Sequence, residues 1–132
     1  MSDANKMTVT YDPAFHDRPG LCEQVVKAHS FFAQRYKSAE GAADSPPVRI
    51  EWKFDPDSYL PLSVVLHERD ARGERSVEWM MSRTALADEV SRNVNMIRFW
   101  GKILEARSRE HMSFTEMAIR RAESLLLEAA HE

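Results

Sequence analysis

The stretch Val48–Phe54 constrains the fold more than any other part of this sequence. Its residues, Val-Arg-Ile-Glu-Trp-Lys-Phe, alternate between apolar and charged without exception. Because successive side chains of a β-strand point to opposite faces of the sheet, this alternation predicts a strand with one buried and one solvated face. We therefore expect a sheet that is covered on one side.

Two further strands are predicted to follow in an antiparallel meander. Asp55–Asp57 has the composition of a turn, and Leu62–His67 alternates as a second strand. Asp70–Gly73 predicts a hairpin loop with a glycine where positive φ is needed, and the third strand is expected from about Arg75 to Met81. The residues expected to share the buried face are Leu62, Val64, Leu66, Val77, Trp79 and Met81.

Before the strands, apolar residues recur at helical spacing from Pro19 onward. A proline in the first turn loses no hydrogen bond, so we expect a helix from Pro19 to near Gly41. The linker-like stretch 41–47 separates this helix from the sheet. Residues 1–18 are expected to form a flexible lead-in, followed by a single domain over residues 19–132.

Residues 84–109 permit two interpretations. In the first, Thr84 caps one long helix with an apolar stripe, whose positions are Leu86, Val90, Val94, Ile97, Gly101 and Leu104. In the second, the helix breaks near Asn93 and two strands follow, at 95–100 and 102–107. Short runs of mixed apolar and polar residues fit both the helical and the strand period, so the pattern leaves the two alternatives open.

The last element is predicted to be a helix that begins at a capping box, Ser113–Glu116. Its apolar band extends through about residue 130, and we expect it to pack on the sheet. The fold class is therefore α+β: an N-terminal helix, a three-stranded antiparallel meander, a helix, a mixed segment and a C-terminal helix on the sheet.

Size, charge and cysteine content restrict the class of protein. The 132 residues suffice for one core, and the net charge of −3 lacks the basic excess of proteins that bind phosphate backbones. Cys22 is the sole cysteine, so no intrachain disulfide can form and a reducing cytoplasm is expected. The sequence predicts neither a membrane span nor an export signal.

A search for chemistry finds no catalytic constellation. The five histidines lack metal-ligand spacing, and no serine or cysteine lies in a nucleophile elbow. The few glycines form no phosphate-binding loop. We therefore predict no catalytic residues, no metal site, no cofactor and no enzymatic activity.

Basic side chains on the predicted strands suggest a second hypothesis. Together with Trp52 and Trp79, they could form a face that stacks and binds single-stranded nucleic acid. The residues concerned are Arg49, Lys53, Arg69, Arg75 and Arg83. Acidic residues are interleaved with them, namely Glu51, Glu68 and Glu78. Because mixed charges attract phosphate weakly, a solvated strand face is the favoured interpretation.

Several short motifs resemble the SsgA-like family of actinobacterial cell-division and sporulation regulators. The matching positions are Phe54-Asp55, Asp57-Ser58-Tyr59, Leu66-His67, Val77-Glu78-Trp79, Arg83 and Leu86. Met96–Trp100 resembles the strand that follows in that family, and Ala122–Leu126 resembles its closing helix. The likeness covers roughly residues 48–130, and its motifs are short.

The resemblance implies a small, non-enzymatic, oligomeric protein that acts at the septum through protein partners, including the tubulin-like division protein FtsZ. It also implies a fold similar to that of whirly-type single-strand binders. Tyr59, Trp79 and Arg83 carry the resemblance and are candidate interaction residues. Arg49 and Arg75 join them as charged candidates on the strands.

The leading hypothesis is thus a non-catalytic protein-interaction module, with a nucleic-acid-binding or phage-type regulatory protein as the alternative. A small enzyme with an interfacial site ranks third. Homo-oligomerisation is expected, because a meander leaves sheet edges that need covering.

Overall fold

The computed structural model describes residues 7–40, 47–70 and 73–130. The chain divides into two units, Met1–Trp100 and Gly101–Glu132, which are described separately. The helices and strands in chain order are β1 (Met7–Tyr11), the 3-10 helix η2 (Pro13–Phe15), α1 (Pro19–Glu40), β2 (Val48–Phe54), β3 (Leu62–Asp70), β4 (Gly73–Met81), α2 (Arg83–Ala87) and α3 (Glu89–Ala130). The predicted class, α+β, is confirmed.

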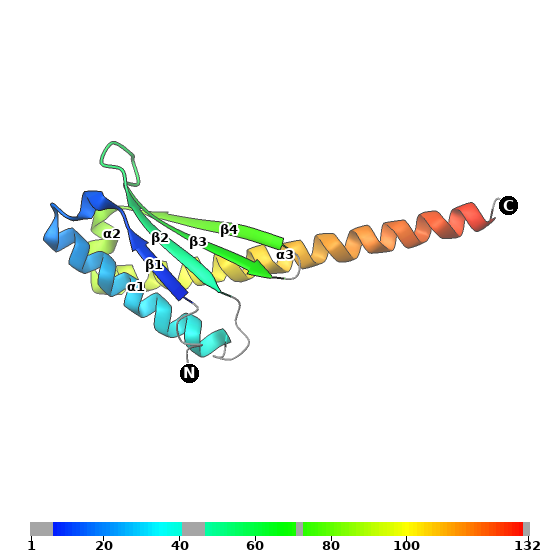
Figure 1. The fold of residues 1–132 in the computed structure, drawn as a ribbon, viewed down its shortest axis with the longest axis horizontal. Helices are drawn as coiled ribbons and strands as arrows, with labels where there is room; N and C mark the ends of the chain where they lie inside the picture. Colours follow the sequence, from blue (N-terminus) through cyan, green and yellow to red (C-terminus); the bar gives the residue numbers. More distant parts are fainter. Residues whose placement is uncertain (1–6, 41–46, 71–72, 131–132) are drawn as a thin grey trace. The chain divides into compact units, whose positions relative to one another are not determined.

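The sheet has four strands in the order β1-β2-β3-β4 (Figure 1). The predicted antiparallel meander is confirmed as β2, β3 and β4, and Gly73 has the positive φ, 122°, that the hairpin prediction required. Residues 71–72 of that loop and residues 41–46 of the predicted linker lie outside the described residues.

The fourth strand, β1, corrects the prediction of a flexible lead-in over residues 1–18, of which residues 1–6 lie outside the described residues. Its five residues pair in parallel with β2, from Met7 opposite Val48 to Tyr11 opposite Trp52. Parallel neighbours need a crossover connection, and α1 supplies it. Asp12 then fixes the end of β1, because its carboxylate accepts hydrogen bonds from the backbone N–H groups of Ala14 and Phe54.

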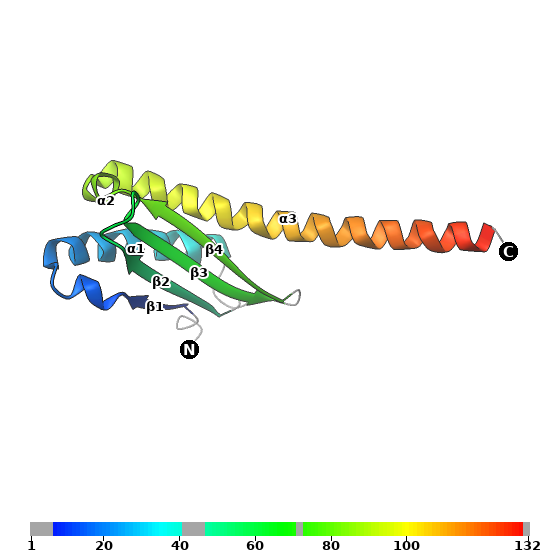
Figure 2. The same cartoon turned by 90° about the horizontal axis from the view of Figure 1, so that it is seen from above.

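The core lies between the sheet and two helices, α1 and the part of α3 up to Trp100 (Figure 2). The alternating residues of β2 supply one wall. Apolar residues of α1 at helical spacing are also buried, namely Leu21, Val25, Phe32 and Tyr36, whereas Val26 is exposed. Phe32 packs against Phe99 with ring centroids 5.0 Å apart. Close aromatic pairs, tilted here by 33°, add to the free energy gained from burial.

Helices α2 and α3 cover residues 83–130 apart from a break at Asp88, so the alternative with strands at 95–100 and 102–107 is wrong. The strand that the family resemblance implied at Met96–Trp100 is therefore absent. Ser82 rather than Thr84 caps α2, since its hydroxyl accepts a hydrogen bond from Ala85 N–H at 3.1 Å. Asp88 caps α3 in the same way through Ser91 N–H, at 2.9 Å.

The buried face of α3 also differs from the predicted stripe. Met96 and Phe99 are buried, whereas Val90, Val94 and Ile97 are exposed. Both sets recur at helical spacing, so α3 has two apolar stripes, and the sheet and α1 bury only the one that carries the larger side chains.

The predicted helix start at Ser113 is wrong, because Ser113 lies inside the continuous helix α3. The described side chains of residues 118–129 are all exposed. They therefore do not supply the buried face that the sequence predicted for a C-terminal helix on the sheet.

Candidate interaction surface on the open sheet face

Within residues 7–100, the helices lie on one face of the sheet and leave the other without a covering element (Figure 2). We call this second side the open face. Its side chains come from the alternate positions of β2, β3 and β4 that point away from the core. They include Arg49, Glu51, Lys53, His67, Arg69, Glu74, Ser76, Glu78 and Met80.

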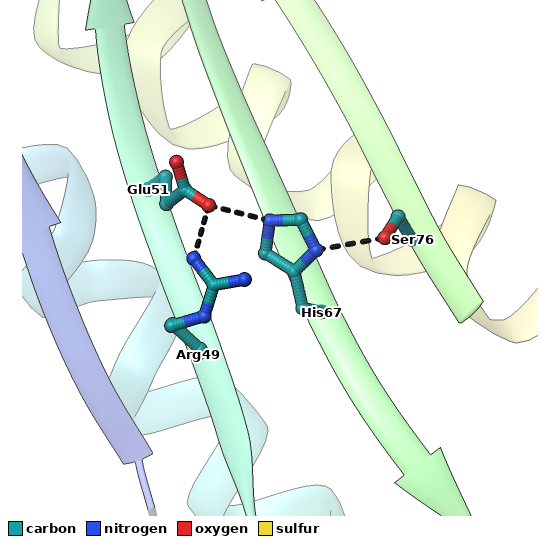
Figure 3. Close-up of polar contacts among 4 residues, drawn as sticks. All are labelled: Arg49, Glu51, His67 and Ser76. Carbon is teal, nitrogen blue, oxygen red and sulfur yellow. Dashed lines mark hydrogen bonds and ion pairs between the residues drawn. The ribbon is translucent and has the colours of Figure 1, made fainter. Parts of the chain in front are cut away.

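Four polar residues form a connected cluster in the middle of the open face (Figure 3). The strand register places Arg49, His67 and Ser76 in one row across β2, β3 and β4, with Glu51 two residues along β2. His67 Nδ1 lies 2.7 Å from Ser76 Oγ, and His67 Nε2 lies 2.7 Å from Glu51 Oε1. The contact with Glu51 has ion-pair distance but does not meet hydrogen-bond geometry.

Glu51 is the charged centre of this cluster. Desolvation by its neighbours raises the pKa of the Glu51 carboxyl. Arg49, through a hydrogen bond and its charge, and His67 lower this pKa by more, so the pKa lies below its ordinary value. Arg49 contacts the same carboxylate oxygen as His67. Glu51 is therefore ionised at neutral pH and contacts both Arg49 and His67.

The contacts from Ser76 to His67 and from His67 to Glu51 have the connectivity of a Ser-His-acid catalytic triad. Such a relay also needs donors aimed at a developing oxyanion, and its serine normally lies on a tight turn. Ser76 instead lies in the middle of the regular strand β4, opposite His67. The arrangement is that of a cross-strand polar ladder, which fixes the orientation of exposed side chains on the sheet.

The charges on the open face are balanced. Arg69 and Glu74 form an exposed cross-strand pair with a 2.6 Å contact. Basic residues at Arg49, Lys53 and Arg69 are accompanied by acidic ones at Glu51, Glu74 and Glu78. A face with both signs interspersed attracts a polyanion weakly and is suited to a partner with its own mixed charges.

Arg75 does not lie on the open face. It points toward the helices, is 9% exposed, and its Nε donates to Glu68 Oε1 at 2.6 Å. The expectation that Arg49 and Arg75 line the same surface is wrong. Arg49 lies in the same row as Ser76, and Arg75 is the next residue along β4, so its side chain points to the opposite face of the sheet.

The three residues that carry the family resemblance have different environments. Trp79 is half-buried on the core side, and its indole N–H donates to Asn95 Oδ1 of α3 at 3.0 Å. Tyr59 is 95% exposed in the loop between β2 and β3. Arg83 is exposed at the start of α2, at the same end of the sheet as this loop, since Leu62 pairs with Met81. Of these three, Tyr59 and Arg83 are accessible to a partner.

Sequence reasoning missed the cluster around His67. It treated Glu51 only as a charge that interrupts a basic face. The signal that identifies the cluster is the hairpin closure: Asp70 pairs with Gly73, and counting back along both strands brings His67 opposite Ser76.

No metal-binding constellation of three His, Cys, Asp or Glu side chains occurs in the part of the chain that the structure describes. Cys22 is a half-exposed free thiol. None of the described helices has the length and apolar composition needed to cross a membrane.

The chain matches no protein-family model, no curated protein and no solved structure.

Proposed function

We propose that this chain is a non-catalytic protein-interaction module that binds a protein partner through the open face of its sheet. The observation that carries the proposal is the ordered charged cluster of Arg49, Glu51, His67 and Ser76 on a face that no described element within residues 7–100 covers (Figure 3). Prealigned polar side chains lose little conformational entropy when a partner binds.

The balanced charges support a protein partner over a nucleic acid. The nucleic-acid alternative depended on five basic residues sharing one surface, and Arg75 is buried in a pair with Glu68 on the other side. An interspersed pattern of both signs gives specificity in protein recognition by rejecting partners with like charges opposite.

A narrower role as a cell-division or sporulation regulator rests on the sequence resemblance alone. Under this proposal the chain acts at the septum through protein partners, among them FtsZ. Co-localisation of the tagged chain with FtsZ tests this part, and uniform distribution in dividing cells contradicts it.

The open face can be tested by site-specific photo-crosslinking in the native host. A photoreactive amino acid at Arg49 or Met80, both on the open face, is expected to give the same cross-linked protein. The matched control is Lys27, which is exposed on α1. An Arg49→Glu/Arg69→Glu variant should lose the product from the Met80 position.

Two outcomes contradict the proposal. The first is cross-linking that is equally strong from Lys27. The second is tight retention on single-stranded DNA that falls steeply with salt and is lost in the Arg49→Glu/Arg69→Glu variant, because this is the behaviour of a phosphate-binding face.

A further inference from the structure

The last part of α3, residues 118–129, is an amphipathic helix with an exposed apolar face. Ile119, Leu125 and Leu126 are 53%, 59% and 71% exposed, respectively. The apolar residues that recur on this face are Ala118, Ile119, Ala122, Leu125, Leu126 and Ala129. Helices of soluble proteins normally bury such a face against another element.

The spacing of this face indicates that the occupant is another helix. Ala118, Ala122, Leu125 and Ala129 are separated by four, three and four residues, which is the spacing of the two core positions in a coiled-coil heptad. Ile119 and Leu126 each follow a core position and flank the seam on one side. Arg121 and Glu128 each precede a core position and flank it on the other side.

We propose that two copies of this chain pair through residues 118–129 as an antiparallel two-helix coiled coil. A two-fold axis between Glu123 and Ser124 brings Ala122 against Leu125 of the partner subunit. The same axis brings Ala118 against Ala129 of the partner subunit. The large core side chain thus meets a small one, so the two helices can approach closely without leaving a cavity.

The flanking positions are complementary in the same alignment. Ile119 meets Leu126 of the partner subunit on the apolar side of the seam. On the other side, Arg121 meets Glu128 of the partner subunit, and the two-fold axis repeats this ion pair. A parallel arrangement would place Arg121 beside Leu126 of the partner subunit instead, so the charges select the antiparallel one. This pairing is independent of the function proposed for the open sheet face.

Sedimentation equilibrium of the full chain over a range of concentrations tests the pairing. Arg121→Glu replaces both ion pairs with like charges, and we expect it to raise the dimer dissociation constant about tenfold. The double variant Arg121→Glu/Glu128→Arg restores opposite charges and should return the constant to nearly its original value.

Leu125→Glu puts a charge in the seam and should abolish the dimer. Leu127→Glu is its matched control, since Leu127 is 63% exposed but projects from the opposite side of the helix to the seam. It should leave the dissociation constant unchanged. Circular dichroism checks that all four variants keep their helix content.

Three results overturn the proposal. One is a chain that stays monomeric up to about 1 mM. Another is a double charge variant as weak as Arg121→Glu, which rejects the antiparallel alignment. The third is an equal effect of Leu125→Glu and Leu127→Glu, which indicates a less selective apolar occupant, such as a lipid surface.

Discussion

Phe99 and Leu126 belong to the same helix, α3, but their environments are opposite. Phe99 is completely buried and packs on Phe32, whereas Leu126 is 71% exposed. Both lie on apolar stripes with helical spacing. The comparison teaches that an amphipathic pattern predicts a helix with an apolar face. It does not predict whether the same chain provides the surface that buries this face.

The largest expected effect tests this comparison directly. Phe99→Ala leaves a cavity beside Phe32 and should lower the free energy of unfolding by about 3–5 kcal/mol. Leu126→Ala should change it by less than about 0.5 kcal/mol at concentrations where the chain is monomeric. Denaturant titration of both variants gives the two values. Similar losses would contradict the contrast between the two parts of α3.

A second test compares two cross-strand ion pairs between β3 and β4. Arg75→Ala leaves the buried carboxylate of Glu68 without this partner and should lower the free energy of unfolding by about 3 kcal/mol. Arg69→Ala breaks the exposed pair with Glu74, and the loss should be below about 1 kcal/mol. Thermal unfolding of both variants measures the difference, and equal shifts would refute the role of burial.

A smaller effect concerns the link between β4 and α3. Asn95→Ala removes the acceptor of the Trp79 indole N–H, and the free energy of unfolding should fall by about 1 kcal/mol. Trp79→Phe removes the donor of the same hydrogen bond. A double-mutant cycle measures the coupling between them, and a coupling near zero would exclude a contribution of this bond.

The smallest effect is the pH dependence contributed by Glu51. Its pKa in the folded chain is below its ordinary value of 4.5, so the ionised carboxylate stabilises the fold at higher pH. This stability is lost as pH falls from about 4.5 through the folded pKa. Water screens the pair, so the loss should be below about 1 kcal/mol. Glu51→Gln should flatten the stability profile in this range, and an unchanged profile would contradict the assignment.

The strands of the meander could be predicted because period-two alternation depends on neighbouring residues alone. The Val48–Phe54 pattern has one apolar face, and the structure buries it. The strand β1 was missed because its pairing with β2 spans the whole of α1, and a five-residue segment carries little local signal. The prediction of a helix start at Ser113 was wrong because a capping motif can also occur inside an uninterrupted helix. Only the longer context decides between a helix start and a continuous helix.

The candidate site was predictable only in part. Alternation along β4 gives Arg75 the same side as Val77, so its burial away from Arg49 could have been derived. The meeting of His67 with Ser76 and Glu51 depends on the register across three strands. That register becomes certain only when the hairpin closes between Asp70 and Gly73.

The sequence by itself determined where the meander strands lie, which side of β2 is apolar, and that α1 begins at Pro19. Each of these follows from short-range periodicity or from the backbone limits of a single residue type. Tertiary structure decided the parallel addition of β1 and the choice between the two apolar stripes of α3. Both depend on contacts between residues that are distant in the chain. The buried stripe of α3 is the one whose side chains fill the space above the sheet.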